Sequence, residues 1–169
     1  MSERSHVLSR LQELGIPYEL HDHEEARSME DCLNLPFLDS DTVFLKNILL
    51  TTRQKDQWFL YLTLPDKPYR TADVSKKLET SRLSFAPPEV LPEMLHLESG
   101  SLSPLGLWFD EQKAITLVLD RDIYAFSRVA VHPCDNHSTL IFSMDAFRHQ
   151  VIPSLHHITV DLSVPWPGK

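Results

Sequence analysis

A short apolar run in the first third of the chain constrains the fold more than any other stretch. Residues 43–50 read Val-Phe-Leu-Lys-Asn-Ile-Leu-Leu, with six apolar side chains and neither glycine nor proline. A run of this length and composition predicts a β-strand that is covered on both faces. Lys46 and Asn47 interrupt it at its centre, and neighbouring side chains on a strand point to opposite faces. The two side chains therefore cannot share one pocket unless the strand bends or ends there.

The pattern alone leaves two interpretations of Lys46 open. On an edge strand its ammonium group could reach solvent along its apolar stem. Alternatively, the strand holds a cationic hydrogen-bond donor at the floor of a cleft, where it needs a partner because an unpaired buried charge is costly.

Helix-like and strand-like segments are mixed along the 169 residues, with short connections between them. Helices are expected over residues 7–14, 28–35, 73–78, 87–95 and 144–151, with Gly15 ending the first and Ser28 and Asp73 as N-caps. Strands are expected over residues 16–21, 43–50, 58–64, 82–85, 115–119, 129–132, 139–142 and 158–160. The pattern predicts one α/β or α+β domain over residues 1–169 around a largely mixed sheet, with a C-terminal strand and loose tail over about 152–169.

Composition and charge exclude several classes of protein. The net charge of −8 argues against binding DNA or RNA through a generally basic surface. The charge is uneven, because residues 43–85 carry eight basic and four acidic side chains, a local balance of +4. No apolar run reaches the ~18 residues of a membrane span, and the N-terminus lacks the apolar core of a signal peptide. With two cysteines, the expected location is a reducing cytoplasm.

Histidine and cysteine side chains suggest two further chemistries. His21, His23, His132, Cys134 and His137 are residue types that bind zinc, but they lack the paired spacing of a strong zinc motif. Cys134 lies two residues after His132, which is compatible with a thiol nucleophile and its base. Inert packing of the thiol is the competing interpretation.

The loop over residues 98–107 contains two of the four glycines, three serines and a proline. Such a segment predicts special backbone geometry. It could present backbone N–H groups to an anion or a polarised carbonyl, or it could be a structural turn.

Four stretches, taken together and in order, resemble the YbaK/prolyl-tRNA synthetase-associated editing domains. They are residues 44–50 with the partner strand 58–64, residues 82–86, the loop 100–107, and His132-Pro133 followed by Asn136 and Thr139. The resemblance runs from about residue 8 to residue 151 and is closest to the freestanding prolyl-tRNA editing branch, which deacylates alanyl-tRNA(Pro). It implies a mixed α/β editing-domain fold, with a mostly antiparallel mixed sheet and flanking helices.

The resemblance also implies a reaction and a set of site residues. The reaction is hydrolysis of the ester that joins a misattached amino acid to the tRNA 3′ end, assisted by a tRNA hydroxyl, with neither metal nor cofactor. Lys46, His132 and Gly100 match the family's lysine, its active-site histidine and the loop whose backbone binds the substrate, so they are the expected catalytic residues. The expected substrate-binding residues are Asn47, Ser101, Ser103, Pro104, Gly106 and Asn136.

The implied partner is aminoacyl-tRNA(Pro), with prolyl-tRNA synthetase as a second candidate and neither membrane nor DNA. The basic segment 43–85 would then lie close to acceptor-stem phosphates. Alternatives are editing of tRNA charged with Cys, Ser or Thr, and a non-catalytic module that binds aminoacyl-tRNA or an amino acid. We expect Lys46 to face a cleft, and Asn47 either to mark a strand irregularity or to support the backbone.

Overall fold

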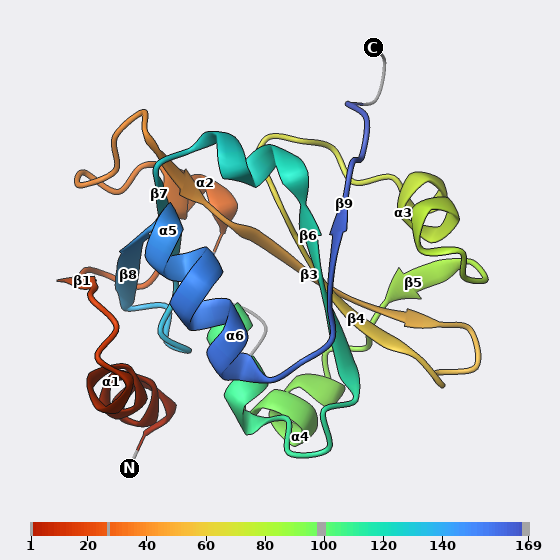
Figure 1. Cartoon of the computed structure of the whole chain (residues 1–169), viewed down its shortest axis with the longest axis horizontal. Helices are drawn as coiled ribbons and strands as arrows, with labels where there is room; N and C mark the ends of the chain where they lie inside the picture. Colours follow the sequence, from red (N-terminus) through yellow and green to blue (C-terminus); the bar gives the residue numbers. More distant parts are fainter. Residues whose placement is uncertain (1, 27, 98–100, 167–169) are drawn as a thin grey trace.

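The computed structural model describes residues 2–26, 28–97 and 101–166, and within them the strands form two sheets (Figure 1). The four-stranded sheet contains, in spatial order, β1 (Glu19–Asp22), β8 (Ser138–Ser143), β7 (Arg128–Val131) and β2 (Thr42–Phe44). The five-stranded sheet contains β5 (Leu83–Phe85), β3 (Lys46–Thr52), β4 (Trp58–Thr63), β6 (Ile115–Asp120) and β9 (Thr159–Leu162). Both sheets are mixed, because β2–β7, β4–β6 and β6–β9 are parallel and the other pairs antiparallel. The mixed α/β class is confirmed.

Short helices flank the sheets, and α1 and α3 lie at opposite sides of the molecule (Figure 1). The helices are α1 (Glu3–Leu14), α2 (Met29–Leu33), α3 (Thr71–Leu78), α4 (Val90–Leu95), α5 (Met144–Ala146) and α6 (Ile152–Leu155). Among the described residues, η2 (Pro104–Phe109) and η3 (Arg121–Ala125) are 3₁₀ helices, and η4 (Phe147–Val151) is a π-helical segment that joins α5 to α6. No helix in the described ranges is long and apolar enough to cross a membrane.

The apolar run 43–50 is divided between the two sheets. Its first part, β2, pairs with β7, and its second part, β3, pairs with β4 and β5. Leu45 lies between them, fully buried, and its N–H donates to the carbonyl of Ala130 at 3.1 Å. The prediction of one strand was therefore wrong, and the irregularity falls one residue before Lys46. A segment that is buried in two successive sheets has the same run of apolar residues as a segment that is buried in a single sheet.

Side chains alternate between three packed clusters. Leu49 of β3 packs between the sheets with Leu60, Leu117, Val129 and Phe142. Its neighbours Ile48 and Leu50 point to the other face of the five-stranded sheet, where α3 contributes Val74. We call this the α3 face, and Tyr61, Leu83 and Val118 also lie on it. In the third cluster, α2 covers the four-stranded sheet through Cys32, against Phe44, Ala130 and Ile141.

Some predicted helix ends are confirmed and others differ, since α1 already begins at Glu3 and α4 begins only at Val90. Gly15 ends α1 at φ +68°, and the Ser28 hydroxyl accepts from the Asp31 N–H at the start of α2. In contrast, α3 begins at Thr71, so Asp73 lies in its first turn and does not cap it. The predicted tail 152–169 begins with α6 and continues into β9, which is hydrogen-bonded to β6.

Candidate functional site

Lys46 is the first residue of β3 and lies opposite Thr63 of β4. It shares its face with Ile48 and Leu50, so its side chain extends over the α3 face. There its Nζ donates a hydrogen bond to the carbonyl oxygen of Lys67, at 3.3 Å. Lys46 is half-buried, and whether it faces a cleft stays a prediction.

The neighbouring lysine, Lys67, is buried in a cluster that the sequence did not predict. Its side chain is 2% exposed, and its Nζ donates to Asp120 Oδ2 at 2.7 Å, to Asp122 Oδ2 at 2.9 Å and to the Val164 carbonyl at 2.6 Å. Burial lowers the pKa of Lys67, but the hydrogen bonds to the two carboxylates outweigh it and the net pKa is raised. Lys67 therefore does not belong to the solvent-facing basic segment with which it was counted.

Asp120 is the centre of this cluster. It is fully buried at the end of β6, and its Oδ2 also accepts from Thr63 Oγ1 at 2.7 Å and from the Tyr61 hydroxyl at 3.3 Å. Burial raises the pKa of Tyr61 above its usual range, with the Asp120 charge adding to the effect, so the phenol stays a donor. The one signal in the sequence was an acidic residue that directly follows the apolar run 115–119.

Asn47 points the other way, towards the junction between the sheets. Its Nδ2 donates to the carbonyl oxygen of Leu45 at 3.2 Å, the residue at which the chain changes sheet. Its Oδ1 is buried and has no hydrogen-bond partner among the described residues. Asn47 thus supports the backbone just before Lys46, and its Oδ1 is left without a donor among the described residues.

His132 follows β7 and is 6% exposed. Its Nδ1 lies 3.0 Å from the Ser138 carbonyl, so Nδ1 carries the proton and Nε2 is left as an acceptor. Nε2 lies 3.6 Å from Cys32 Sγ, and the ring meets Phe44 edge-on at 5.2 Å. Burial lowers the pKa of His132, and it raises the pKa of Cys32 to about 11, with Asp31 contributing. The two side chains thus form a neutral pair.

The two expected catalytic side chains contact different partners. Lys46 contacts Lys67 above the five-stranded sheet, whereas His132 contacts α2 on the four-stranded sheet. The backbone connects them, because Leu45, next to Lys46, is hydrogen-bonded to Ala130, two residues before His132. Their roles in catalysis remain predictions.

The predicted substrate loop is only partly described, because Gly100 lies outside the described residues. Ser103 is fully buried, and its hydroxyl accepts from the Leu105 N–H at 3.2 Å, which caps η2. Pro104 begins η2, and Gly106 packs so closely that an added Cβ would lie 2.7 Å from Leu97 Cδ1. These three residues shape the loop from within, and whether they touch substrate stays a prediction.

Ser101 and Asn136, two expected substrate-binding residues, lie at one small cavity of about 190 Å³. The start of α1 and the His-Pro turn line it, through Ser2, Glu3, Arg4, Cys134, Asp135 and His137. The loop and the turn therefore meet at this cavity. Asn136 also donates from Nδ2 to Glu25 Oε1 at 3.3 Å.

The zinc and thiol hypotheses gain no geometric support. No group of three or more His, Cys, Asp or Glu side chains within residues 2–26, 28–97 and 101–166 is arranged to hold a metal ion. His21 instead stacks on Phe37 at 4.1 Å, and His23 contacts Thr139 Oγ1 at 2.8 Å. Burial raises the pKa of Cys134 above its usual range, and the sulfur next to His132 belongs to Cys32.

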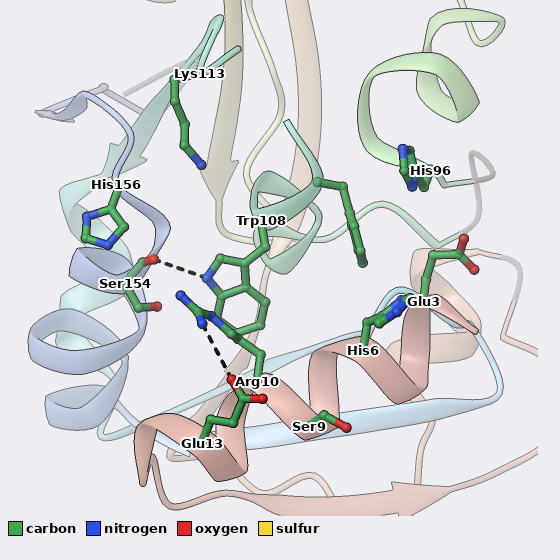
Figure 2. Close-up of a pocket in the computed structure, with 11 residues that line it drawn as sticks. Glu3, His6, Ser9, Arg10, Glu13, His96, Trp108, Lys113, Ser154 and His156 are labelled. Carbon is green, nitrogen blue, oxygen red and sulfur yellow. Dashed lines mark hydrogen bonds and ion pairs between the residues drawn. The ribbon is translucent and has the colours of Figure 1, made fainter. Parts of the chain in front are cut away.

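A second cavity, of about 630 Å³, lies between α1, η2 and the end of α6 (Figure 2). Glu3, His6 and Arg10 of α1 line one side of it, and Trp108 of η2 lines another. Trp108 Nε1 donates to the Ser154 carbonyl at 3.2 Å. None of the predicted site residues is among those that line this cavity.

Comparison with known families identifies the family of this chain. Residues 23–149 match the family model described as the aminoacyl-tRNA editing domain, which is more than half of the chain. The chain belongs to this family and is an aminoacyl-tRNA deacylase, as the resemblance predicted.

The similar proteins share a more specific description. The chain is 30% identical over 145 residues to the prolyl-tRNA editing protein ProX of Acetoanaerobium sticklandii, covering 86% of this chain and 88% of that protein. It is 27% identical over 133 residues to prolyl-tRNA synthetase associated domain-containing protein 1 of Danio rerio, covering 77% and 71% of the two chains. The crystal structure of a candidate trans-editing enzyme for prolyl-tRNA synthetase has the same fold, with a TM-score of 0.73, 12% identity and coverage of 98% and 99%.

Proposed function

We propose that the protein is a trans-editing enzyme that hydrolyses mischarged tRNA(Pro), with alanyl-tRNA(Pro) as its main substrate. The names of its relatives support the tRNA. The observation that carries the site assignment is the state of Lys46. Lys67 is neutralised by two carboxylates, whereas in the described part of the chain Lys46 forms no ion pair and binds only a backbone carbonyl. Its positive charge is therefore available to a substrate.

Hydrolysis of an aminoacyl ester requires few catalytic groups from the protein. An aminoacyl ester is already activated, so holding a water molecule in place and stabilising the oxyanion can supply much of the rate. In the proposed mechanism Lys46 holds the terminal adenosine or the aminoacyl group, and the tRNA's own ribose hydroxyl assists the attacking water. No protein nucleophile is needed, which fits the raised pKa values of Cys32 and Cys134.

Asn47 and His132 have supporting roles in this proposal. The Asn47 amide holds the Leu45 carbonyl and so fixes the backbone next to Lys46. Neutral His132 fixes the turn that carries Asn136, through the Ser138 carbonyl. A pocket sized for a methyl side chain would exclude the proline ring by its volume.

RNA would approach over the exposed part of the basic segment. With Lys67 buried, its remaining exposed cations are Arg53, Lys55, Arg70, Lys76, Lys77 and Arg82. The acidic balance of the rest of the chain would limit indiscriminate binding of RNA. We further propose that the enzyme works in the cytoplasm, where tRNA is charged, and that prolyl-tRNA synthetase is a candidate partner.

A panel of charged tRNAs tests the proposal. Purified protein without added metal should release alanine from alanyl-tRNA(Pro) faster than it releases cysteine, serine, threonine or proline from the same tRNA. Lys46→Ala should lower kcat/KM about a hundredfold, whereas Lys113→Gln, at an exposed position outside the basic segment, should change it little. Faster release of cysteine, serine or threonine would move the specificity to that amino acid. Tight binding without turnover across the panel would favour a non-catalytic binding module instead.

A further inference from the structure

Phe85 is a large apolar side chain that the fold leaves in solvent. It ends β5, the edge strand of the five-stranded sheet, and is 66% exposed. Its ring lies 5.4 Å from that of Tyr69, which lies 6.2 Å from that of the buried Tyr61. Three aromatic rings thus lead from solvent onto the α3 face of the sheet.

Cations surround the outer end of this row. Arg70 follows Tyr69 directly, Arg82 lies just before β5, and Lys76 and Lys77 are in the last turn of α3. All four are exposed. Residues 69–86 carry these four basic side chains and two acidic ones, in a chain whose net charge is −8. Figure 1 shows α3 and β5 next to one another at the edge of the molecule farthest from α1.

The aromatic row lies on the same face as Lys46. Phe85 pairs with Leu50 of β3, and Lys46 lies four residues before Leu50 on that strand. At about 3.3 Å per residue, the distance along β3 is about 13 Å. Lys46 also binds the carbonyl of Lys67, two residues before Tyr69. The predicted catalytic lysine and the exposed ring thus lie on the same face of the sheet, with the buried residues Ile48 and Leu50 between them along β3.

We propose that Phe85 and Tyr69 form a stacking step for an unpaired base near the 3′ end of the tRNA, with Arg70 and Arg82 at the adjoining phosphates. This inference rests on the proposed function, because it takes Lys46 as the contact of the terminal nucleotide. A single strand rises at least about 3.4 Å per nucleotide step, so about 13 Å is spanned by at most about four steps from the terminal nucleotide. That span is comparable with the unpaired 3′ tail of a tRNA. Because every base has a π-face, the step accepts any base.

Binding of a deacylated RNA minihelix with a single-stranded 3′ tail tests this step, in comparison with the same minihelix cut blunt. Phe85→Ser in the full chain should weaken binding of the tailed minihelix about tenfold and leave the blunt one unchanged. Phe85→Tyr should retain the wild-type affinity. The matched control is Ile158→Ser, because Ile158 is 73% exposed and lies beside β9, at the opposite edge of the sheet from β5. Thermal unfolding of each variant confirms that it is folded.

Two results would overturn the stacking step. If the wild type and Phe85→Ser bound the tailed minihelix with equal affinity, Phe85 would not stack on the RNA, and its exposed ring would instead be a candidate contact for a protein. An equal loss on tailed and blunt minihelices would show that Phe85 acts on the duplex or on the fold. The minihelix carries no ester, so its binding is measured independently of deacylation. If the protein released no amino acid but needed Phe85 to bind the tail, the result would contradict the proposed reaction and leave the stacking step standing.

Discussion

Asn47 donates a hydrogen bond to the carbonyl of Leu45 and so encloses Lys46 between donor and acceptor, at the point where the chain leaves one sheet for the other. A strand that changes sheet leaves backbone groups without their regular partners. The Asn47 amide satisfies one of them. Asn47 therefore stabilises the backbone that sets the position of the predicted catalytic lysine.

Replacing Asn47 with leucine should affect both stability and rate. The variant leaves the Leu45 carbonyl without its donor, so we expect the free energy of unfolding to fall by about 1–3 kcal/mol. Displacement of Lys46 should lower kcat about ten- to a hundredfold. Denaturant unfolding and single-turnover deacylation measure the two effects. Asn47→Gln, which keeps the amide on a longer stem, is the control, and a full rate in Asn47→Leu would remove the positioning role.

Asp120 and Asp122 offer a matched pair of substitutions around Lys67. Asp120→Asn leaves a buried ammonium without its main counter-charge, so we expect it to destabilise the protein by about 3–5 kcal/mol. Asp122 is 47% exposed at its side chain, so Asp122→Asn should cost under about 1 kcal/mol. Urea midpoints of the two variants check this order. Equal losses would mean that the cluster is solvated in solution.

Burial of His132 should make stability depend on pH. Its pKa is lowered in the folded protein, so between that value and the unfolded value of about 6.5 the unfolded chain binds more protons. The contribution of His132 is complete above about pH 6.5 and is lost as the pH falls through this window. The free energy of unfolding of the wild type should therefore decrease more steeply on acidification than that of His132→Gln. Parallel curves would contradict a buried, neutral histidine.

Cys134→Ser should leave deacylation unchanged. The thiol is buried, its pKa is raised above the usual range, and the contact of His132 is Cys32. The native protein should also react slowly with iodoacetamide at pH 8 and quickly once unfolded. Loss of turnover in a folded Cys134→Ser variant would return the thiol to the mechanism.

Local rules predicted much of the fold from the sequence. Gly15 and Ser28 marked helix ends through their own backbone and side-chain preferences, and the strand formers at 58–63 identified β4. The four matching stretches identified the family, because order and separation together are specific even where each stretch is not.

Long-range pairings were beyond local rules. Lys67 reads as a surface residue, since its carboxylate partners lie 53 and 55 residues further along the chain. Cys32 and His132 are separated by 100 residues, so Cys134 was the nearer but wrong neighbour. The polar interruption at Lys46 and Asn47 was the one signal of the change of sheet at Leu45, because both sheets require the same apolar pattern.

That change of sheet also affects how the protein unfolds. Residues 42–52 supply a strand to each sheet, so neither sheet can separate without pulling on the other. Slow amide exchange should therefore extend without a break from β2 through Leu45 into β3, and the two sheets should melt in one cooperative transition. The position of Lys46 at this junction therefore depends on the free energy of global unfolding and not on the stability of a local loop.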